Sequence, residues 1–116
     1  MKIKSGCDIV KISRMEGFFE KGGLKRFFTE NEGEYILSKR NPYETAAGIF
    51  AAKEALGKAM GKGLSSFPAK DIEVCHNETG APYFSFPGGV FDNFEISLSI
   101  SHDGEYALAF VVAREI

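Results

Sequence analysis

The sequence predicts an α+β domain in which an N-terminal strand is followed by helices and then by an antiparallel sheet. Three observations carry this prediction. Residues 3–12 are rich in Ile and Val, helix-capping patterns recur between residues 13 and 44, and alternation of apolar and polar residues begins after residue 70. A chain of 116 residues, 44% of them hydrophobic, suits one packed domain over 1–116.

The first two helices are predicted from their start signals. The form Ser/Thr-x-x-Glu occurs at Ser13 and again at Thr29, which is the spacing of a capping box. The first helix is expected to end at Gly22-Gly23, because glycine favours a helix C-terminus, and the second at about Ser38.

The third start signal opens a longer helix that is expected to end at about Met60. Asn41 is a good N-cap, Pro42 suits the first helical position, and Glu44 has the spacing to close a box. The segment Gly61-Lys62-Gly63 follows as a terminator. One apolar stripe runs along this helix: Ile49, Ala52, Leu56, Ala59 and Met60.

The last part of the chain predicts two pairs of strands. Segments 72–75 and 82–86 are joined by the turn sequence Asn-Glu-Thr-Gly. Segment 95–101 alternates strictly, and 106–113 is expected to pair with it across a turn at 102–104. This order of elements completes the α+β plan.

Composition excludes several classes of function. The net charge of −2 and pI of about 5.7 argue against a non-specific nucleic-acid binder, which needs an excess of Lys and Arg. Two distant cysteines, Cys7 and Cys75, suit small apolar strand residues better than a disulfide scaffold or a zinc site. No signal peptide or membrane-spanning window is evident, so a cytoplasmic location is expected.

Two acids are candidate functional residues. Asp8 lies in an otherwise apolar strand, where it either faces solvent or requires a partner. Glu54 shares a helix face with Lys58 and Gly57, and Glu54 and Lys58 have the spacing of an ordinary surface ion pair. Gly57 lowers helix propensity while leaving space beside Glu54, as either a ligand or close helix packing would require.

Two carboxylates together with several lysines suggest a magnesium–phosphate site. Magnesium prefers one or two carboxylates with water and phosphate oxygens, and lysine supplies charge to phosphate. The available cations are Lys53, Lys58 and Lys62. Backbone N–H groups around Gly61 and Gly63 are further candidate donors.

His102 is the third candidate, because it lies where a strand enters a turn. A histidine bonded locally within the turn is the alternative. His76 alternates out of a strand and is expected to be solvated. A Ser-His-Asp triad at 101–103 is excluded, since triad members converge from separate segments.

Three motifs together resemble the holo-acyl-carrier-protein synthase family, of the 4′-phosphopantetheinyl transferases. They are the opening strand GCDIVKISR at 6–14, the helix run FAAKEA at 50–55 with its following KA and GKG, and SISH at 99–102 with Tyr106. Their order and spacing agree over essentially the whole chain. One departure is Ile49, where family members commonly carry Arg. In the family this arginine belongs to the nucleotide-binding surface, so the resemblance leaves its contact with coenzyme A to another side chain such as Lys53.

The resemblance implies roles for these residues. Asp8 and Glu54 would bind Mg²⁺ and share the catalytic role with Lys58, which would contact the coenzyme A diphosphate. His102, Gly80 and Pro82 would lie near the nucleotide end. The residues expected on the carrier-protein-docking region are Arg14, Met15, Phe18, Lys21, Lys25 and Arg26. The basic members of this set suit an acidic carrier protein.

The implied reaction transfers 4′-phosphopantetheine from coenzyme A to a serine of apo-acyl-carrier protein, a step that serves fatty acid biosynthesis. Glu54 is the expected acceptor of the serine proton. The resemblance also implies a homotrimer with active sites between subunits. Two alternatives are a non-catalytic carrier-protein or nucleotide-binding module of the same fold, and a purely structural α+β domain.

Overall fold

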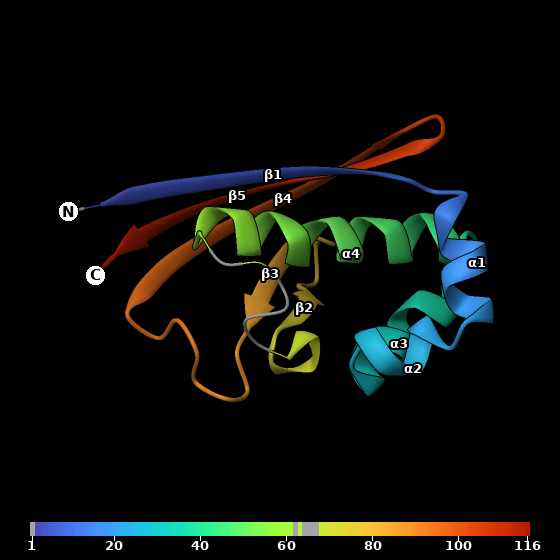
Figure 1. Cartoon of the computed structure of the whole chain (residues 1–116), viewed down its shortest axis with the longest axis horizontal. Coiled ribbons are helices and arrows are strands. Elements are labelled where there is room, and N and C mark those ends of the chain that lie inside the picture. The colour runs from blue at the N-terminus through green and yellow to red at the C-terminus, as the bar shows by residue number, and fades with distance from the viewer. Residues whose placement is uncertain (1, 62, 64–67) are drawn as a thin grey trace.

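The long helix α4 (Pro42–Ala59) packs along one face of a three-stranded antiparallel sheet, as Figure 1 shows. The sheet consists of β1 (Ile3–Lys11), β5 (Tyr106–Glu115) and β4 (Phe94–Asp103), in the order β1-β5-β4. This arrangement confirms the predicted α+β class. The computed structural model describes residues 2–61, 63 and 68–116.

The remaining elements lie on the side of α4 away from this sheet or at one end of the helix (Figure 1). The hairpin of β2 (Glu73–His76) and β3 (Pro82–Ser85) forms a second, two-stranded sheet, preceded by the short 3₁₀ helix η2 (Ala69–Asp71). The short helices gather near the N-terminal end of α4: α1 (Arg14–Glu20), α2 (Gly23–Phe27) and α3 (Glu30–Leu37).

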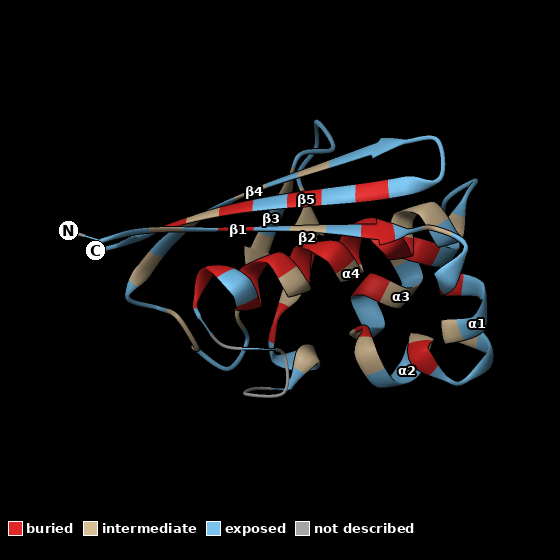
Figure 2. Ribbon diagram, turned by 45° about the horizontal axis from the view of Figure 1, so that its top comes forward, coloured by how far each residue is buried: buried red, intermediate tan, exposed pale blue. Residues whose placement is uncertain are grey.

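Alternation along the central strand β5 decides which face of the sheet is covered. Ala107, Ala109, Val111 and Ala113 are buried, while the residues between them are exposed or half-buried, as Figure 2 shows by colour. The period of two therefore places one row against α4 and the other on the outer face of the sheet. The buried row of β5 and the apolar stripe predicted for α4 together form the core.

Small residues bring α4 unusually close to β1. A Cβ atom added at Gly6 would lie 2.0 Å from the carbonyl oxygen of Ala55 and 2.7 Å from the amide nitrogen of Ala59. Only glycine allows this approach. Gly6 therefore fixes the distance between Asp8 on β1 and the second half of α4.

The helix-start predictions are confirmed in part. Thr29 and Glu32 form the complete capping box of α3, and the Asn41 side chain accepts a hydrogen bond from the backbone N–H of Glu44. Ser13 makes no side-chain cap, so that predicted box is wrong. The first helix does end near Gly22, but Gly23 begins α2, a helix that was not predicted.

The strand predictions differ from the structure mainly at their ends. The hairpin of β4 and β5 pairs Asp103 with Tyr106, so the turn lies at Gly104 and Glu105 instead of at 102–104. Both cysteines are free, but Cys7 is exposed and does not act as a core residue. Within the described part of the chain, no helix is long and apolar enough to cross a membrane.

Candidate active site

Asp8 and Lys58 form an ion pair between β1 and α4. The Nζ atom of Lys58 lies 2.9 Å from Oδ1 of Asp8, and it also donates to the carbonyl oxygen of Cys7 at 3.0 Å. The Asp8 side chain retains 17% of its exposure and that of Lys58 retains 56%. The hydrogen bond that Lys58 donates to Asp8 raises the pKa of Lys58, so this lysine remains charged. Asp8 does not simply face solvent.

Glu54 lies one helical turn before Lys58 and is half-buried. Burial raises the pKa of the Glu54 carboxyl, and the negative charge of Asp8 raises it further, against the opposing effects of Lys58 and Arg14. The two carboxylates therefore lie close enough for their charges to interact. Lys58 is paired with Asp8 among the ion pairs of the described residues, so the simple surface pair with Glu54 does not form.

This donor set fits a magnesium ion. Two carboxylates that repel each other, one of them half-buried, would be stabilised by a divalent cation between them. The described residues contain no cluster of three or more His, Cys, Asp or Glu able to hold a metal. Magnesium does not require one, because waters and phosphate oxygens complete its shell.

Lys53 does not take the predicted role of binding coenzyme A. Its side chain is fully buried, and its Nζ atom lies 2.7 Å from Oε1 of Glu32. The same amino group donates to the carbonyl oxygens of Phe27 and Ala69. All three donors of the ammonium are therefore used inside the protein. Lys53 is a structural residue, and it does not replace the arginine that is absent at position 49.

The segment after α4 is only partly available to a ligand. The backbone N–H of Gly61 donates to the carbonyl oxygen of Lys58, so it is already used at the helix end. Gly61 adopts a φ of 68°, which glycine tolerates best. Gly63 is exposed. Lys62 lies outside the described residues.

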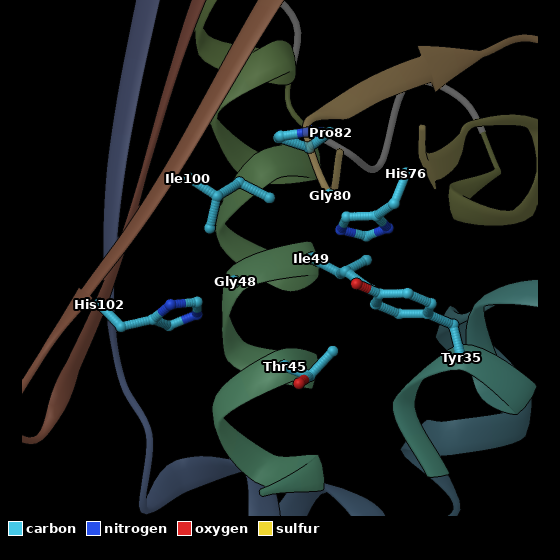
Figure 3. Close-up of a pocket in the computed structure, with 9 residues that line it drawn as sticks. All are labelled: Tyr35, Thr45, Gly48, Ile49, His76, Gly80, Pro82, Ile100 and His102. Carbon is cyan, nitrogen blue, oxygen red and sulfur yellow. The ribbon is translucent and has the colours of Figure 1, made fainter. Parts of the chain in front are cut away.

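A cavity of about 170 Å³ brings together residues from five elements and one turn. His102 from β4 lines it together with Gly80 and Pro82 from the β2–β3 hairpin. Figure 3 shows His102 on one side of α4 and His76 and Tyr35 on the other. The complete lining is Tyr35, Thr45, Gly48, Ile49, His76, Gly80, Pro82, Ile100 and His102.

Gly48 allows His102 to approach α4. A Cβ atom at this position would lie 3.0 Å from Nε2 of His102 and 2.9 Å from Cγ2 of Ile100. Such contacts are too close for a side chain without displacement of the neighbours. The close packing of β4 on α4 therefore depends on this glycine, which the sequence analysis did not single out.

His76 and Tyr35 are site residues that the sequence analysis missed. Their rings stack face to face, 4.0 Å apart and 8° from parallel, so the prediction of a solvated His76 is wrong. Burial lowers the pKa of His76, with a smaller contribution from the charge of Lys39. No local pattern predicts this contact, because the two residues are 41 positions apart.

The predicted docking residues divide into two groups. Arg14, Phe18 and Lys21 lie around a hollow of about 300 Å³ with Phe50 at its edge. Lys25 and Arg26 are exposed on α2. Met15 also lines this hollow, but it is only 1% exposed and belongs to the core, which corrects its assignment as a docking residue.

Comparison with known proteins agrees with this fold and shows the family. A sequence model of the 4′-phosphopantetheinyl transferase superfamily matches residues 4–111. The holo-[acyl-carrier-protein] synthase of Caldanaerobacter subterraneus subsp. tengcongensis is 39% identical, over 97% of this chain and 95% of that protein. The holo-[acyl-carrier-protein] synthase of Halothermothrix orenii is 41% identical, over 95% of each chain.

Solved structures of holo-acyl-carrier-protein synthases share the fold of this chain. The holo-(acyl-carrier-protein) synthase of Bacillus anthracis, in complex with coenzyme A (3′,5′-ADP), superposes with a TM-score of 0.86 at 34% identity, over 97% of this chain and 96% of that one. The Helicobacter pylori enzyme in complex with coenzyme A gives 0.84 at 33% identity, over 95% and 99%.

The fold and the site thus define a phosphopantetheinyl transferase. Within that superfamily, the chain belongs to the holo-[acyl-carrier-protein] synthase family.

Proposed function

We propose that this chain transfers the 4′-phosphopantetheine group of coenzyme A to a serine of an apo-acyl-carrier protein, in a magnesium-dependent reaction. The carrier serine oxygen forms a bond to the β-phosphorus, and the bond from that phosphorus to the bridging oxygen breaks. The bridging oxygen leaves with adenosine 3′,5′-bisphosphate. The observation that carries this proposal is the cluster of Asp8, Glu54 and Lys58. It occurs in a chain whose relatives are named holo-[acyl-carrier-protein] synthases.

Asp8 and Glu54 are the residues that would hold Mg²⁺, whose charge would neutralise the diphosphate during transfer. Glu54 is also the candidate acceptor of the serine proton, because its raised pKa makes it a stronger base than an exposed glutamate. Lys58 is oriented by Asp8 and supplies a fixed positive charge beside the diphosphate.

Two neighbouring surfaces would position the substrates. The cavity around His102, Gly80 and Pro82 is the proposed site for the nucleotide end of coenzyme A. The exposed cations Arg14, Lys21, Lys25 and Arg26, with the hollow beside Phe18, would receive an acidic carrier protein. We place this activity in fatty acid biosynthesis in the cytoplasm.

We further propose that the chain forms a homotrimer through the outer face of its sheet, with active sites between subunits. Large apolar side chains remain exposed on these strands, which is typical of an interaction surface. The exposed large apolar residues of β1 and β5 are Ile3, Ile9, Tyr106, Leu108 and Phe110.

The test is conversion of apo-acyl-carrier protein to the holo form, followed by mass spectrometry. We expect the carrier to gain the mass of phosphopantetheine with coenzyme A and magnesium present, and to gain none after chelation. Asp8→Asn and Glu54→Gln should each reduce the conversion rate by at least about a hundredfold, whereas Glu105→Gln, in the exposed β4–β5 turn, should not. Unmodified carrier under every condition would overturn the proposal.

One observation favours a second candidate, a non-catalytic module that binds the carrier protein or the nucleotide. Ile49 is 1% exposed and lines the cavity at the position where the family commonly has arginine. Binding of coenzyme A and carrier protein with no gain of mass would support this candidate.

A further inference from the structure

The cavity between β4 and the β2–β3 hairpin has a lining that is poor in charge. Its lining includes no lysine, arginine, aspartate or glutamate among the described residues. The two imidazoles, His76 and His102, are therefore the lining groups able to carry charge near neutral pH. Figure 3 shows them on opposite sides of α4.

The imidazole of His76 is held in a fixed orientation. Tyr35 covers one face of its ring at a centroid distance of 4.0 Å, and the Nζ atom of Lys39 lies 4.5 Å from the Tyr35 ring centroid. An imidazole fixed in this way at the wall of a cavity presents its edge and its other face to whatever enters. An aromatic face suits a purine base, and a protonated imidazole edge suits a phosphate.

We propose that His76, positioned by Tyr35, is a nucleotide-binding residue that determines how strongly this chain binds the phosphorylated nucleoside end of coenzyme A, and that it makes this affinity rise as the pH falls. The inference rests on the proposed function, in that the nucleotide end of coenzyme A occupies this cavity. It adds a residue from β2 that neither the family motifs nor the sequence analysis assigned to the site.

The direction of the pH effect follows from the groups around His76. Tyr35 and Lys39 lie beside it on the α3 side, and His102 lines the cavity on the opposite side of α4. Pro82 of β3 and Thr45 and Ile49 of α4 carry no charge. Burial and Lys39 lower the pKa of His76 below its ordinary 6.5, so the free protein holds it neutral at pH 7. A bound phosphate opposes both effects and raises that pKa. Binding therefore takes up a proton, and affinity increases towards acid pH.

The experiment measures binding of adenosine 3′,5′-bisphosphate by calorimetry from pH 5.5 to 8.5. His76→Asn removes the titratable ring and keeps a polar side chain, and the ratio of wild-type to variant affinity cancels the pH effects that both proteins share, such as titration of the phosphate. We expect wild-type binding to be about tenfold tighter than the variant at pH 5.5, falling to about twofold at pH 8.5. Measurements in two buffers of different ionisation enthalpy should show that the variant takes up fewer protons.

Three further variants test the stacked ring and the charge separately. Tyr35→Phe keeps the stack and should bind as wild type, whereas Tyr35→Leu removes the ring and should weaken binding of the bisphosphate. His76→Lys supplies a fixed charge, so its affinity relative to that of His76→Asn should change little with pH. An affinity ratio for His76→Asn that does not change with pH, or that stays at one, would overturn the inference.

The same variant distinguishes this inference from the proposed function. In the carrier conversion assay, His76→Asn should raise the KM for coenzyme A about fivefold to tenfold at pH 6 and leave kcat unchanged. An active wild type whose KM is unaffected by this substitution would overturn the inference alone. A wild type that binds the bisphosphate with the expected pH dependence but never modifies a carrier would overturn the proposed function alone.

Discussion

The raised pKa of Glu54 suits its proposed role as a base, but it lowers the stability of the fold. Its pKa is raised because burial and the charge of Asp8 both disfavour its ionised form. A carboxyl whose pKa is higher in the folded than in the unfolded protein destabilises the fold as the pH rises through that range. Functional residues often carry such a cost.

The substitution Glu54→Gln is therefore expected to separate stability from activity. Without metal at pH 7, we expect a small gain in melting temperature, about 1–3 °C, because solvent screens this half-buried group. The gain should disappear below about pH 4, where the wild-type carboxyl is protonated in both states. Differential scanning fluorimetry across pH checks this, and a loss of melting temperature in the variant at pH 7 would contradict it.

The same substitution, Glu54→Gln, should lower activity while it raises stability. If ionised Glu54 is required, the carrier conversion rate of the wild type should fall on the acid side as this carboxyl becomes protonated. Glu54→Gln should reduce the rate by at least about a hundredfold. The exposed control Glu105→Gln should keep both the rate and the pH profile.

Lys53 and Glu32 illustrate the other kind of charged residue, one that organises elements. The pair is completely buried, and Glu32 also accepts hydrogen bonds from the backbone N–H groups of Thr29 and Val74. Together with the bonds from Lys53 to Phe27 and Ala69, this network joins α2, α3, α4, η2 and β2.

Removing one member of this pair should be strongly destabilising. Lys53→Met leaves the Glu32 carboxylate buried without its cation, which should cost about 3–5 kcal/mol in the free energy of unfolding. Urea denaturation measures this quantity. The double variant Lys53→Met/Glu32→Gln should recover part of the loss, and Arg114→Gln, which breaks the exposed pair with Glu95, should cost less than about 1 kcal/mol.

At the scale of elements, the contact of β1 with α4 sets the geometry of the site. Gly6→Ala would force the helix away from the strand, because the new Cβ would lie 2.0 Å from a backbone oxygen of Ala55. We expect a loss of about 2–4 kcal/mol in stability and a disproportionate loss of activity, since Asp8 would separate from Lys58. The matched control is Gly17→Ala in α1, where the added methyl meets nothing within 4 Å. It should be neutral or stabilise the protein by about 0.5–1 kcal/mol.

At the scale of the whole molecule, the outer face of the sheet is expected to bring copies of the chain together. Light scattering after size exclusion should give the mass of a trimer for the wild type. Phe110→Asp should give a monomer, because it places a charge among exposed apolar side chains of the sheet. Leu37→Asp makes the same kind of change at an exposed residue of α3 and should leave the trimer intact. If wild type and Phe110→Asp gave the same mass, the proposed interface on the outer face of the sheet would be contradicted.

The local parts of this fold were predictable from sequence, and the long-range parts were not. The capping box at Thr29 and the Asn41-Pro42 start depend on residues three or four positions apart, so their patterns are visible in the sequence. The burial of Lys53 depends on Glu32 and Ala69, and the orientation of His76 depends on Tyr35. No periodicity connects such residues, and the family motifs likewise gave no sign that Lys53 is internal.

The pairing of the sheet has a consequence for synthesis of the protein. Strand β5 lies between β1 and β4, so β1, which is synthesised before the rest of this sheet, finds its partner only among residues 106–115. Until those residues leave the exit tunnel, the apolar side of β1 has no neighbouring strand, and α4 has only part of the surface on which it packs. The nascent chain therefore completes its fold after nearly the whole of this sequence has been translated, and a ribosome stalled before Tyr106 should hold a protease-sensitive intermediate.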